Sequence, residues 1–233
     1  MQWALISSDG MFFALRWFHT FFGIIWIGLL YYFNFVQGAF FAETDAPTKS
    51  QAIQKLVPRA LWWFRYGALA TFLLGWAIIT GRAHQNGLEF FASSYGVTIL
   101  TGGTLGTLMF LNVWLVIWPM QKIVIASATQ AAQGGQPLPN AAAAGAKASL
   151  ASRTNVLFSI PMLFFMAAAR HLPLAVSPET NFIVVTLVMG LIILALEVNA
   201  LKGKLGPLTT IRGVMTSGFV LTAVLYVALE FTL

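Results

Sequence analysis

The sequence predicts an all-α integral-membrane bundle of six transmembrane helices, and two observations carry that prediction. First, 58% of the 233 residues are hydrophobic and only 9% are charged, whereas soluble domains usually carry about 25% charged residues. Second, the apolar residues gather in long runs of the length, about 20 residues, that crosses a bilayer as a helix. Mean hydropathy is accordingly high, at +0.80. We therefore expect the surface of this protein to face lipid.

The apolar runs form a single transmembrane domain over 1–233. The predicted spans are 11–41, 61–81, 95–119, 153–169, 182–201 and 212–229. The first span is longer than a bilayer requires, so it should tilt or extend beyond the lipid. It is also too long for a cleavable signal peptide, and the residues before it lack a basic region, so we expect no cleaved signal.

Two segments between the spans carry local signals. Residues 42–60 are predicted to be a cytoplasmic loop with an interfacial helix, because Asp45-Ala-Pro-Thr is typical of a helix start and apolar residues follow at helical spacing. Residues 120–152 are predicted to be a second cytoplasmic loop, with a turn-rich break at 133–140. The alanine-rich run after this break could extend the fourth span backwards as a protruding helix.

Lysine and arginine set the expected orientation. Ten of them lie in, or at span ends beside, the loops after the first, third and fifth spans: Lys49, Lys55, Arg59, Arg65, Lys122, Lys147, Arg153, Lys202, Lys204 and Arg212. The opposite side has only Arg16, Arg82 and Arg170. Because cytoplasmic loops are enriched in basic residues, we expect both termini on the outer, periplasmic side of a bacterial inner membrane. Contact with anionic lipid explains the net charge of +6, so no nucleic-acid partner is predicted.

All three histidines fall on the outer side, and the chain contains no cysteine. Disulfides, thiolate metal sites and covalent haem attachment are therefore excluded. Neutral imidazole is a good ligand for haem iron or copper, so His19 and His171 are the candidate cofactor and metal ligands, with haem b favoured over copper. His19 lies deeper in its span, where a polar ring normally needs a partner. The alternative to a ligand role is that a histidine is a solvated polar residue at a helix end, and this description fits His84 best.

A second polar group lies in the inner half of the spans. Arg65, Asn112, Arg153 and Asn155 are the candidates for catalytic or substrate contacts. Polar groups at membrane depth are costly unless paired, so they should face the bundle interior, where Glu197 offers either arginine a partner. Arginine and asparagine, with tryptophan for stacking, would suit a planar anionic substrate. The same residues could instead be packing contacts between helices or a positive-inside anchor.

Four strings, taken in order, resemble one family. They are Arg16-Trp-Phe-His19 followed by Gly23-Ile-Ile-Trp26-Ile-Gly28, Leu61-Trp-Trp-Phe-Arg65-Tyr-Gly67, Asn112-Val-Trp114-Leu-Val-Ile-Trp118-Pro119-Met-Gln121-Lys122, and Ser152-Arg153-Thr-Asn155 through Ser159-Ile-Pro161. Together they resemble the membrane domain of the bacterial cytochrome c-linked urate hydroxylase family (PuuD-type). The resemblance covers roughly 11–173, four of the predicted spans.

The resemblance implies a membrane redox protein that oxidises urate or a similar small substrate, or relays electrons, with cytochrome c as acceptor. In the full-length family a cytochrome c domain follows the membrane domain. This chain has no cysteine, so we expect a separate periplasmic cytochrome c, with a haem relay at the outer histidines.

The alternative is a non-catalytic or haem-binding accessory subunit of a larger respiratory or oxygenase complex. Its partners would be the other subunits of that complex, or further copies of this chain in a homo-oligomer, which would pack on the aromatic surface. A transporter is less favoured, because paired discontinuous helices in two repeats are not evident.

Overall fold

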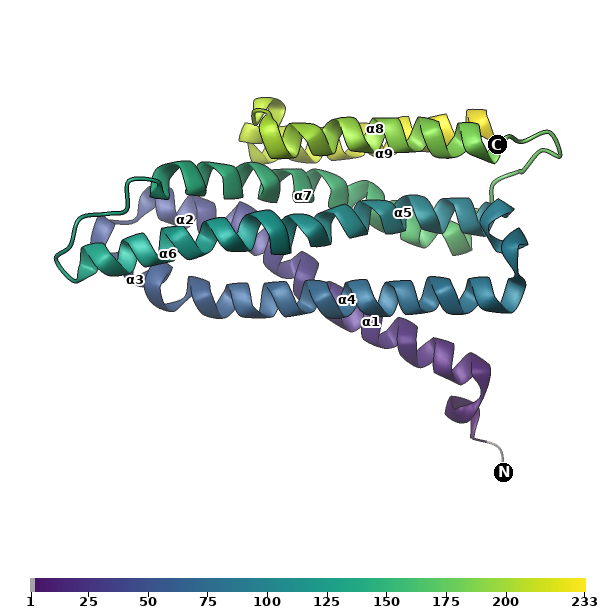
Figure 1. Cartoon of the computed structure of the whole chain (residues 1–233), viewed down its shortest axis with the longest axis horizontal. Helices are drawn as coiled ribbons and strands as arrows, with labels where there is room; N and C mark the ends of the chain where they lie inside the picture. The colour runs from purple at the N-terminus through teal and green to yellow at the C-terminus, as the bar shows by residue number, and fades with distance from the viewer. Residues whose placement is uncertain (1–2) are drawn as a thin grey trace.

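The computed structural model describes residues 3–233, and within that range it is all-helical, with 87% helix and no strand. Six continuous helical segments are long and apolar enough to cross a membrane: Ser8–Glu43, Val57–Asn86, Ser94–Ala132, Ala141–His171, Phe182–Lys202 and Ile211–Thr232. They run side by side in one bundle, and both ends of the chain lie at the same end of it (Figure 1). The predicted fold class is confirmed.

Two of the six segments contain a π-helical turn. The first consists of α1 (Ser8–Tyr31), the π turn η2 (Tyr32–Gln37) and α2 (Gly38–Glu43). The third consists of α5 (Ser94–Leu111), the π turn η4 (Asn112–Ile117) and α6 (Trp118–Ala132). In η4 the Trp118 N–H donates to the carbonyl of Val113. Pro119 comes next and has no N–H to donate, which favours an irregular turn at this point.

The remaining long helices are single. They are α4 (Val57–Asn86), α7 (Ala141–His171), α8 (Phe182–Lys202) and α9 (Ile211–Thr232). Short helices join them: η1 (Ala4–Ile6) before α1, α3 (Ala46–Lys55) between α2 and α4, η3 (Leu88–Ala92) before α5, and η5 (Gly206–Thr209) before α9. The Asp45 side chain accepts the Thr48 N–H at the start of α3, and Pro47 occupies the first turn. This short helix lies where the sequence predicts one.

The predicted loop over 120–152 is wrong for most of its length. Helix α6 continues to Ala132 and α7 begins at Ala141, so only 133–140 connects the two. Alanine is the best helix former, and the residues after 140 are mostly alanine. Hydropathy marks only the apolar part of a helix, whereas α6 and α7 continue beyond their apolar residues.

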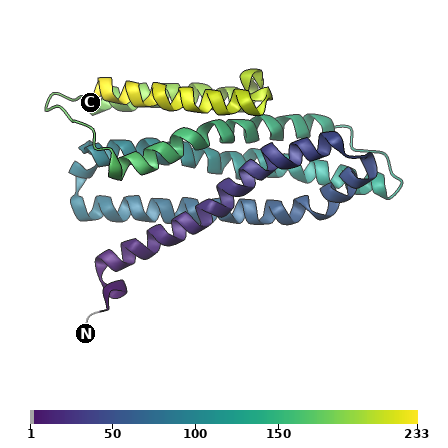
Figure 2. The ribbon, with the colours of Figure 1, turned by 180° about the vertical axis from the view of Figure 1, so that it is seen from behind.

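Helix α7 is the most buried of the six spans. Helices α5, α6 and α9 pack on it, while α1 packs mainly on α4 (Figure 2). Glycine permits the closest crossings: a Cβ at Gly67 would lie 3.3 Å from the Trp26 backbone nitrogen, and one at Gly102 would lie 3.3 Å from that of Met166. Small residues therefore bring α4 to α1 and α5 to α7, as small-residue contacts do between membrane helices.

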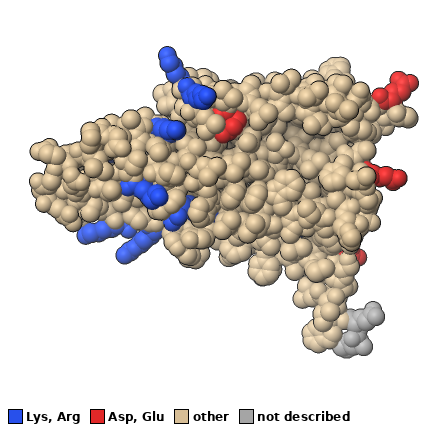
Figure 3. Space-filling view, viewed as in Figure 1, with Lys and Arg blue, Asp and Glu red and all other residues tan. Residues whose placement is uncertain are grey.

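Charged side chains divide between the two ends of the bundle. On the face drawn in Figure 3, Lys and Arg gather at the end that holds α3 and the α6–α7 connection, whereas most Asp and Glu lie toward the opposite end. We call the end that holds both chain termini the outer end and the other the inner end. This separation matches the pattern of basic cytoplasmic and less basic external loops in multi-pass membrane proteins.

Candidate functional site

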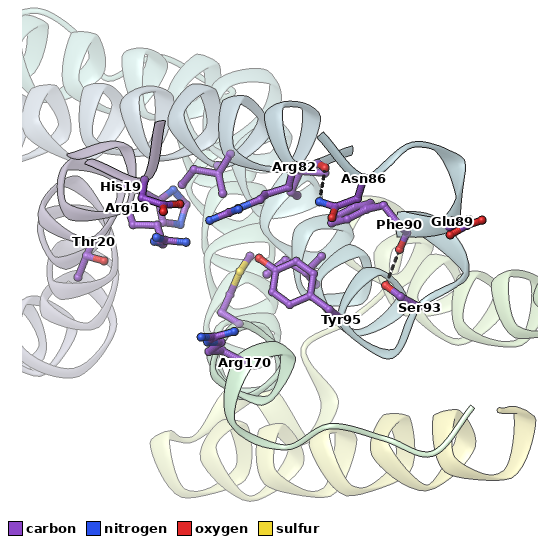
Figure 4. Close-up of a pocket in the computed structure, with 16 residues that line it drawn as sticks. Arg16, His19, Thr20, Arg82, Asn86, Glu89, Phe90, Ser93, Tyr95 and Arg170 are labelled. Carbon is purple, nitrogen blue, oxygen red and sulfur yellow. Dashed lines mark hydrogen bonds between the residues drawn. The ribbon is translucent and has the colours of Figure 1, made fainter. Parts of the chain in front are cut away.

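A cavity of about 960 Å³ opens at the outer end of the bundle. Helices α1, α4, α5 and α7 and the short helix η3 all contribute to its lining. The polar side chains that line it include Arg16, His19, Arg82, Asn86, Tyr95 and Arg170 (Figure 4). Three cations from three different helices therefore meet around one space.

Arg82 is the most firmly held of these cations. Its guanidinium carbon lies 4.2 Å from the centroid of the Phe12 ring, and its Nη1 donates to Gln85 Oε1 at 3.1 Å. Gln85 in turn donates to the hydroxyl of Ser8 at 2.9 Å. Contacts from both α1 and α4 thus orient Arg82 at the cavity, and a stacked, hydrogen-bonded guanidinium loses little further freedom on binding an anion.

The net charge of the lining is positive. Arg16, Arg82 and Arg170 face two carboxylates, Asp9 and Glu89, that also line the cavity. The difference is one positive charge, counting His19 as neutral. This arrangement favours a small anion over a cation.

Flat and hydrogen-bonding groups line the side toward α5. The rings of Phe90 and Tyr95 lie 5.7 Å apart, centroid to centroid, and Phe90 is buried. Asn86 Nδ2 donates to the Arg82 carbonyl at 2.8 Å, which leaves its side-chain oxygen as an acceptor. The lining can therefore stack on a planar ring and also exchange hydrogen bonds with it.

His19 lies at the floor of this cavity, half buried in α1. Its Nδ1 is 2.9 Å from the backbone carbonyl oxygen of Thr71 in α4. A smaller, mostly apolar pocket of about 50 Å³ adjoins it, and four residues line both spaces: His19, Gly75, Ile79 and Met166. His19 thus lies between a polar outer cavity and an apolar inner pocket.

Comparison with known proteins assigns the family. A family model described as "Urate oxidase N-terminal" matches residues 83–228, which is more than half of the chain. The chain belongs to the urate oxidase N-terminal family. No curated protein and no solved structure matches it.

The family match confirms the resemblance given by the sequence strings, although it covers a different part of the chain. The strings between Arg16 and Gly67 precede the matched residues, and those from Asn112 to Pro161 fall within them. In this urate oxidase N-terminal protein the match also includes η3, α5 and α7, which supply one side of the outer cavity. The other side comes from α1 and α4.

The outer histidines do not form one group. His171 and His84 are exposed, and neither is among the residues that line the cavity. Within residues 3–233 no cluster of three or more His, Cys, Asp or Glu side chains is arranged to hold a metal ion. The cavity lining offers one imidazole and does not fit a haem held by both His19 and His171. Their roles as haem or copper ligands stay predictions, and the function proposed below uses no such step.

Two of the four inner candidates do come together. Asn112 Nδ2 donates to Asn155 Oδ1 at 3.0 Å and to Glu197 Oε2 at 3.1 Å, and Asn155 Nδ2 donates to the Met109 carbonyl at 2.9 Å. Both asparagines are at most 1% exposed. This network ties the third, fourth and fifth spans together, which supports a structural role. A substrate role for the two asparagines remains a prediction.

The two inner arginines lie outside this network. Arg65 donates from Nε to the Leu61 carbonyl at 3.2 Å and stacks on Trp118. Arg153 Nη1 is buried and has no hydrogen-bond partner in the part of the chain that the structure describes. Neither arginine forms the pair with Glu197 that the sequence suggested, since Glu197 is held by Asn112. None of the four candidates lines the outer cavity.

The sequence did not predict that the three outer arginines form one site. Arg16, Arg82 and Arg170 are the three basic residues on the side that is otherwise poor in them, and they served only to fix the orientation. Basic residues kept on the side where the positive-inside rule disfavours them are a signal for an external anion site. Tyr95 and Met166 carried no signal of their own, because only the packing of α5 and α7 brings them to the cavity.

Proposed function

We propose that this protein is a membrane oxidoreductase that binds urate, or a planar anion like it, in the outer cavity and passes its electrons to a separate cytochrome c. The observation that carries the proposal is the meeting of three arginines from α1, α4 and α7 around one cavity. One imidazole and two aromatic rings packed edge to face also line this cavity. Membership in the urate oxidase N-terminal family supports urate as the substrate.

The chemistry of the ligand matches this lining. Urate is a planar purine that carries one negative charge near neutral pH, with carbonyl oxygens and N–H groups around its edge. Arginine presents several N–H donors in a plane and can pair with two acceptors of a flat anion at once. Arg82 and Arg170 supply such donors, while Tyr95, which is only partly buried, offers a ring face for stacking.

The position of the cavity suits an external electron acceptor. It opens at the outer end, where both chain termini and most of the visible acidic side chains lie (Figures 1 and 3). A c-type cytochrome on the periplasmic side could approach there without crossing the membrane. Loss of two electrons and one proton from the urate anion would give a neutral oxidised purine. The electrons would pass to two oxidised cytochromes, and the proton would leave through a group in the cavity.

Urate binding is tested first, with the full chain reconstituted in lipid nanodiscs and equilibrium dialysis against radiolabelled urate. We expect saturable binding that Arg170→Gln weakens at least tenfold, since a charge-assisted hydrogen bond contributes about 1.5–3 kcal/mol. Arg212→Gln is the matched control, because Arg212 is an exposed arginine at the inner end. Absence of urate binding, or equal loss in both variants, would overturn the cavity as the substrate site.

Electron transfer is a separate measurement. Urate and oxidised soluble cytochrome c are mixed with the nanodiscs, and reduction of the cytochrome is followed by its visible absorbance. We expect urate-dependent reduction that Arg170→Gln slows. Urate binding without any cytochrome reduction would contradict the redox part of the proposal and leave a urate-binding protein.

A further inference from the structure

The hydrogen bond between His19 and Thr71 fixes the position of a proton. A backbone carbonyl can only accept, so the Nδ1 atom that lies 2.9 Å from Thr71 O carries a hydrogen. In a neutral imidazole the other nitrogen, Nε2, is then an unprotonated acceptor. Nε2 makes no hydrogen bond to any residue in the described range 3–233, and the His19 ring lines the cavity (Figure 4).

This hydrogen bond depends on a glycine one turn further along α4. In a regular helix the Thr71 carbonyl also accepts the N–H of Gly75. A Cβ at Gly75 would lie 2.9 Å from Cε1 and 3.2 Å from Nδ1 of His19, closer than van der Waals contact permits. The missing side chain therefore lets the imidazole approach α4 and share a carbonyl already used by the helix.

We propose that His19 is the proton acceptor of the outer cavity, held with its proton on Nδ1 by the Thr71 carbonyl and its Nε2 lone pair free, and that Gly75 is the positioning residue for this state. The inference rests on the proposed function and deepens it by assigning the base. This role requires an N–H of the bound purine anion to come within hydrogen-bond distance of Nε2, and the His19 ring lines the cavity that would hold the purine.

As the purine is oxidised, its N–H bond breaks and an Nε2–H bond forms on His19. The two electrons leave to two oxidised c-type cytochromes. The imidazolium that results keeps its Nδ1–H bond to Thr71 and then releases the Nε2 proton to water in the cavity. Positively charged Arg16 and Arg82 line the same space and disfavour a lasting second cation there.

The test is nitrogen NMR on the full chain in nanodiscs with 15N-labelled histidine. Only three histidines are present, so the signals that disappear in His19→Gln belong to His19. We expect a protonated Nδ1 and an unprotonated Nε2 in the unliganded protein, and a change in the Nε2 signal on adding urate. Gly75→Ala should remove this pattern, whereas Gly28→Ala should keep it, because nothing lies within 4 Å of a Cβ at Gly28.

The outcomes separate this inference from the proposed function. A protonated Nε2 with an unprotonated Nδ1 overturns it directly in wild-type protein, so the result does not depend on the folding of a variant. Urate binding by dialysis with no response at Nε2 removes the role of His19 and leaves the cavity as the substrate site. A Gly75→Ala protein with unchanged His19 signals overturns the positioning role of Gly75. Absence of urate binding overturns the proposed function and the acceptor role with it, while the tautomer and the role of Gly75 are still read from the unliganded spectrum.

Discussion

The guanidinium carbon of Arg65 lies 3.5 Å from the centroid of the Trp118 ring. Arg65 is on α4 and Trp118 begins α6, so this stacked pair joins the second and third spans at the inner end. Lys122 Nζ lies 5.6 Å from the same ring. The aromatic face stabilises a cation near the membrane interface, where no carboxylate within residues 3–233 is paired with it.

Replacing Arg65 should therefore affect stability more than binding. We expect Arg65→Ala to lower the free energy of unfolding by about 1–2 kcal/mol and Arg65→Lys to lose less, because a lysine keeps part of the cation–π contact. Thermal unfolding in a fixed detergent measures both. Arg59→Ala is the control, since Arg59 is exposed near the same end of α4. Lost urate binding at unchanged stability would instead support the substrate role predicted for Arg65 from the sequence.

The second prediction concerns the stability that the buried asparagine network provides. Removing the Asn112 amide leaves two acceptors, Asn155 Oδ1 and Glu197 Oε2, without that donor in the bundle interior. Each unsatisfied buried group costs about 1–3 kcal/mol, so Asn112→Ala should destabilise by at least about 2 kcal/mol.

A double-mutant cycle checks the origin of that loss. Glu197→Leu, a side chain of similar size, is combined with Asn112→Leu in the same unfolding assay. We expect the double variant to be more stable than the sum of the two single losses predicts, because the Glu197 carboxyl that Asn112→Leu alone leaves without a donor is then absent. Strict additivity would show that the two side chains are energetically independent.

The helix α3 should respond to acid. Hydrogen bonds from the Thr48 hydroxyl and the Thr48 N–H lower the pKa of the exposed Asp45 carboxyl. The contribution of the Asp45 carboxylate to the stability of α3 is therefore fully present above the usual pKa of aspartate. It is lost as pH falls through the lowered pKa of the folded state. We expect amide hydrogen exchange in the first turn of α3 to quicken, after correction for intrinsic rates, as pH falls below the usual aspartate range. Asp45→Asn keeps a capping oxygen without a titrating proton, so its corrected exchange should not vary with pH.

The orientation is testable because the chain has no cysteine of its own. Single cysteines are placed at two exposed sites, Gln136 in the α6–α7 connection and Glu179 in the α7–α8 connection. With both termini outside, a membrane-impermeant maleimide should label Glu179→Cys in intact cells and Gln136→Cys only after lysis. The reverse pattern would place the arginine cavity on the cytoplasmic side and remove access for a periplasmic cytochrome.

Hydropathy located the membrane helices because a helix that contacts lipid has a long run of apolar residues. It failed between α6 and α7, where Gln130 and Ala141 belong to helices although no lipid signal marks them. There the alanine-rich composition was the better guide, since helix propensity acts whether or not the helix lies in lipid.

The candidate site was only partly readable for a similar reason. His19 stood out because a polar ring at depth needs a partner, and that partner is a backbone carbonyl, which any residue type supplies. No sequence pattern could therefore name Thr71. Gly75 matters because it has no side chain next to the His19 ring. This role can be recognised only from the packing of α1 against α4.

The length of the first span connects the cavity to the lipid around it. Its 36 residues correspond to about 54 Å of helix, against a hydrocarbon core of about 30 Å. The span crosses the bundle obliquely, resting mainly on α4 (Figure 2). A thicker bilayer should draw α1 more upright and a thinner one should tilt it further. Arg16 and His19 lie on α1, whereas Tyr95 and Arg170 lie on other helices. Membrane thickness would therefore alter the distance between the two sides of the outer cavity.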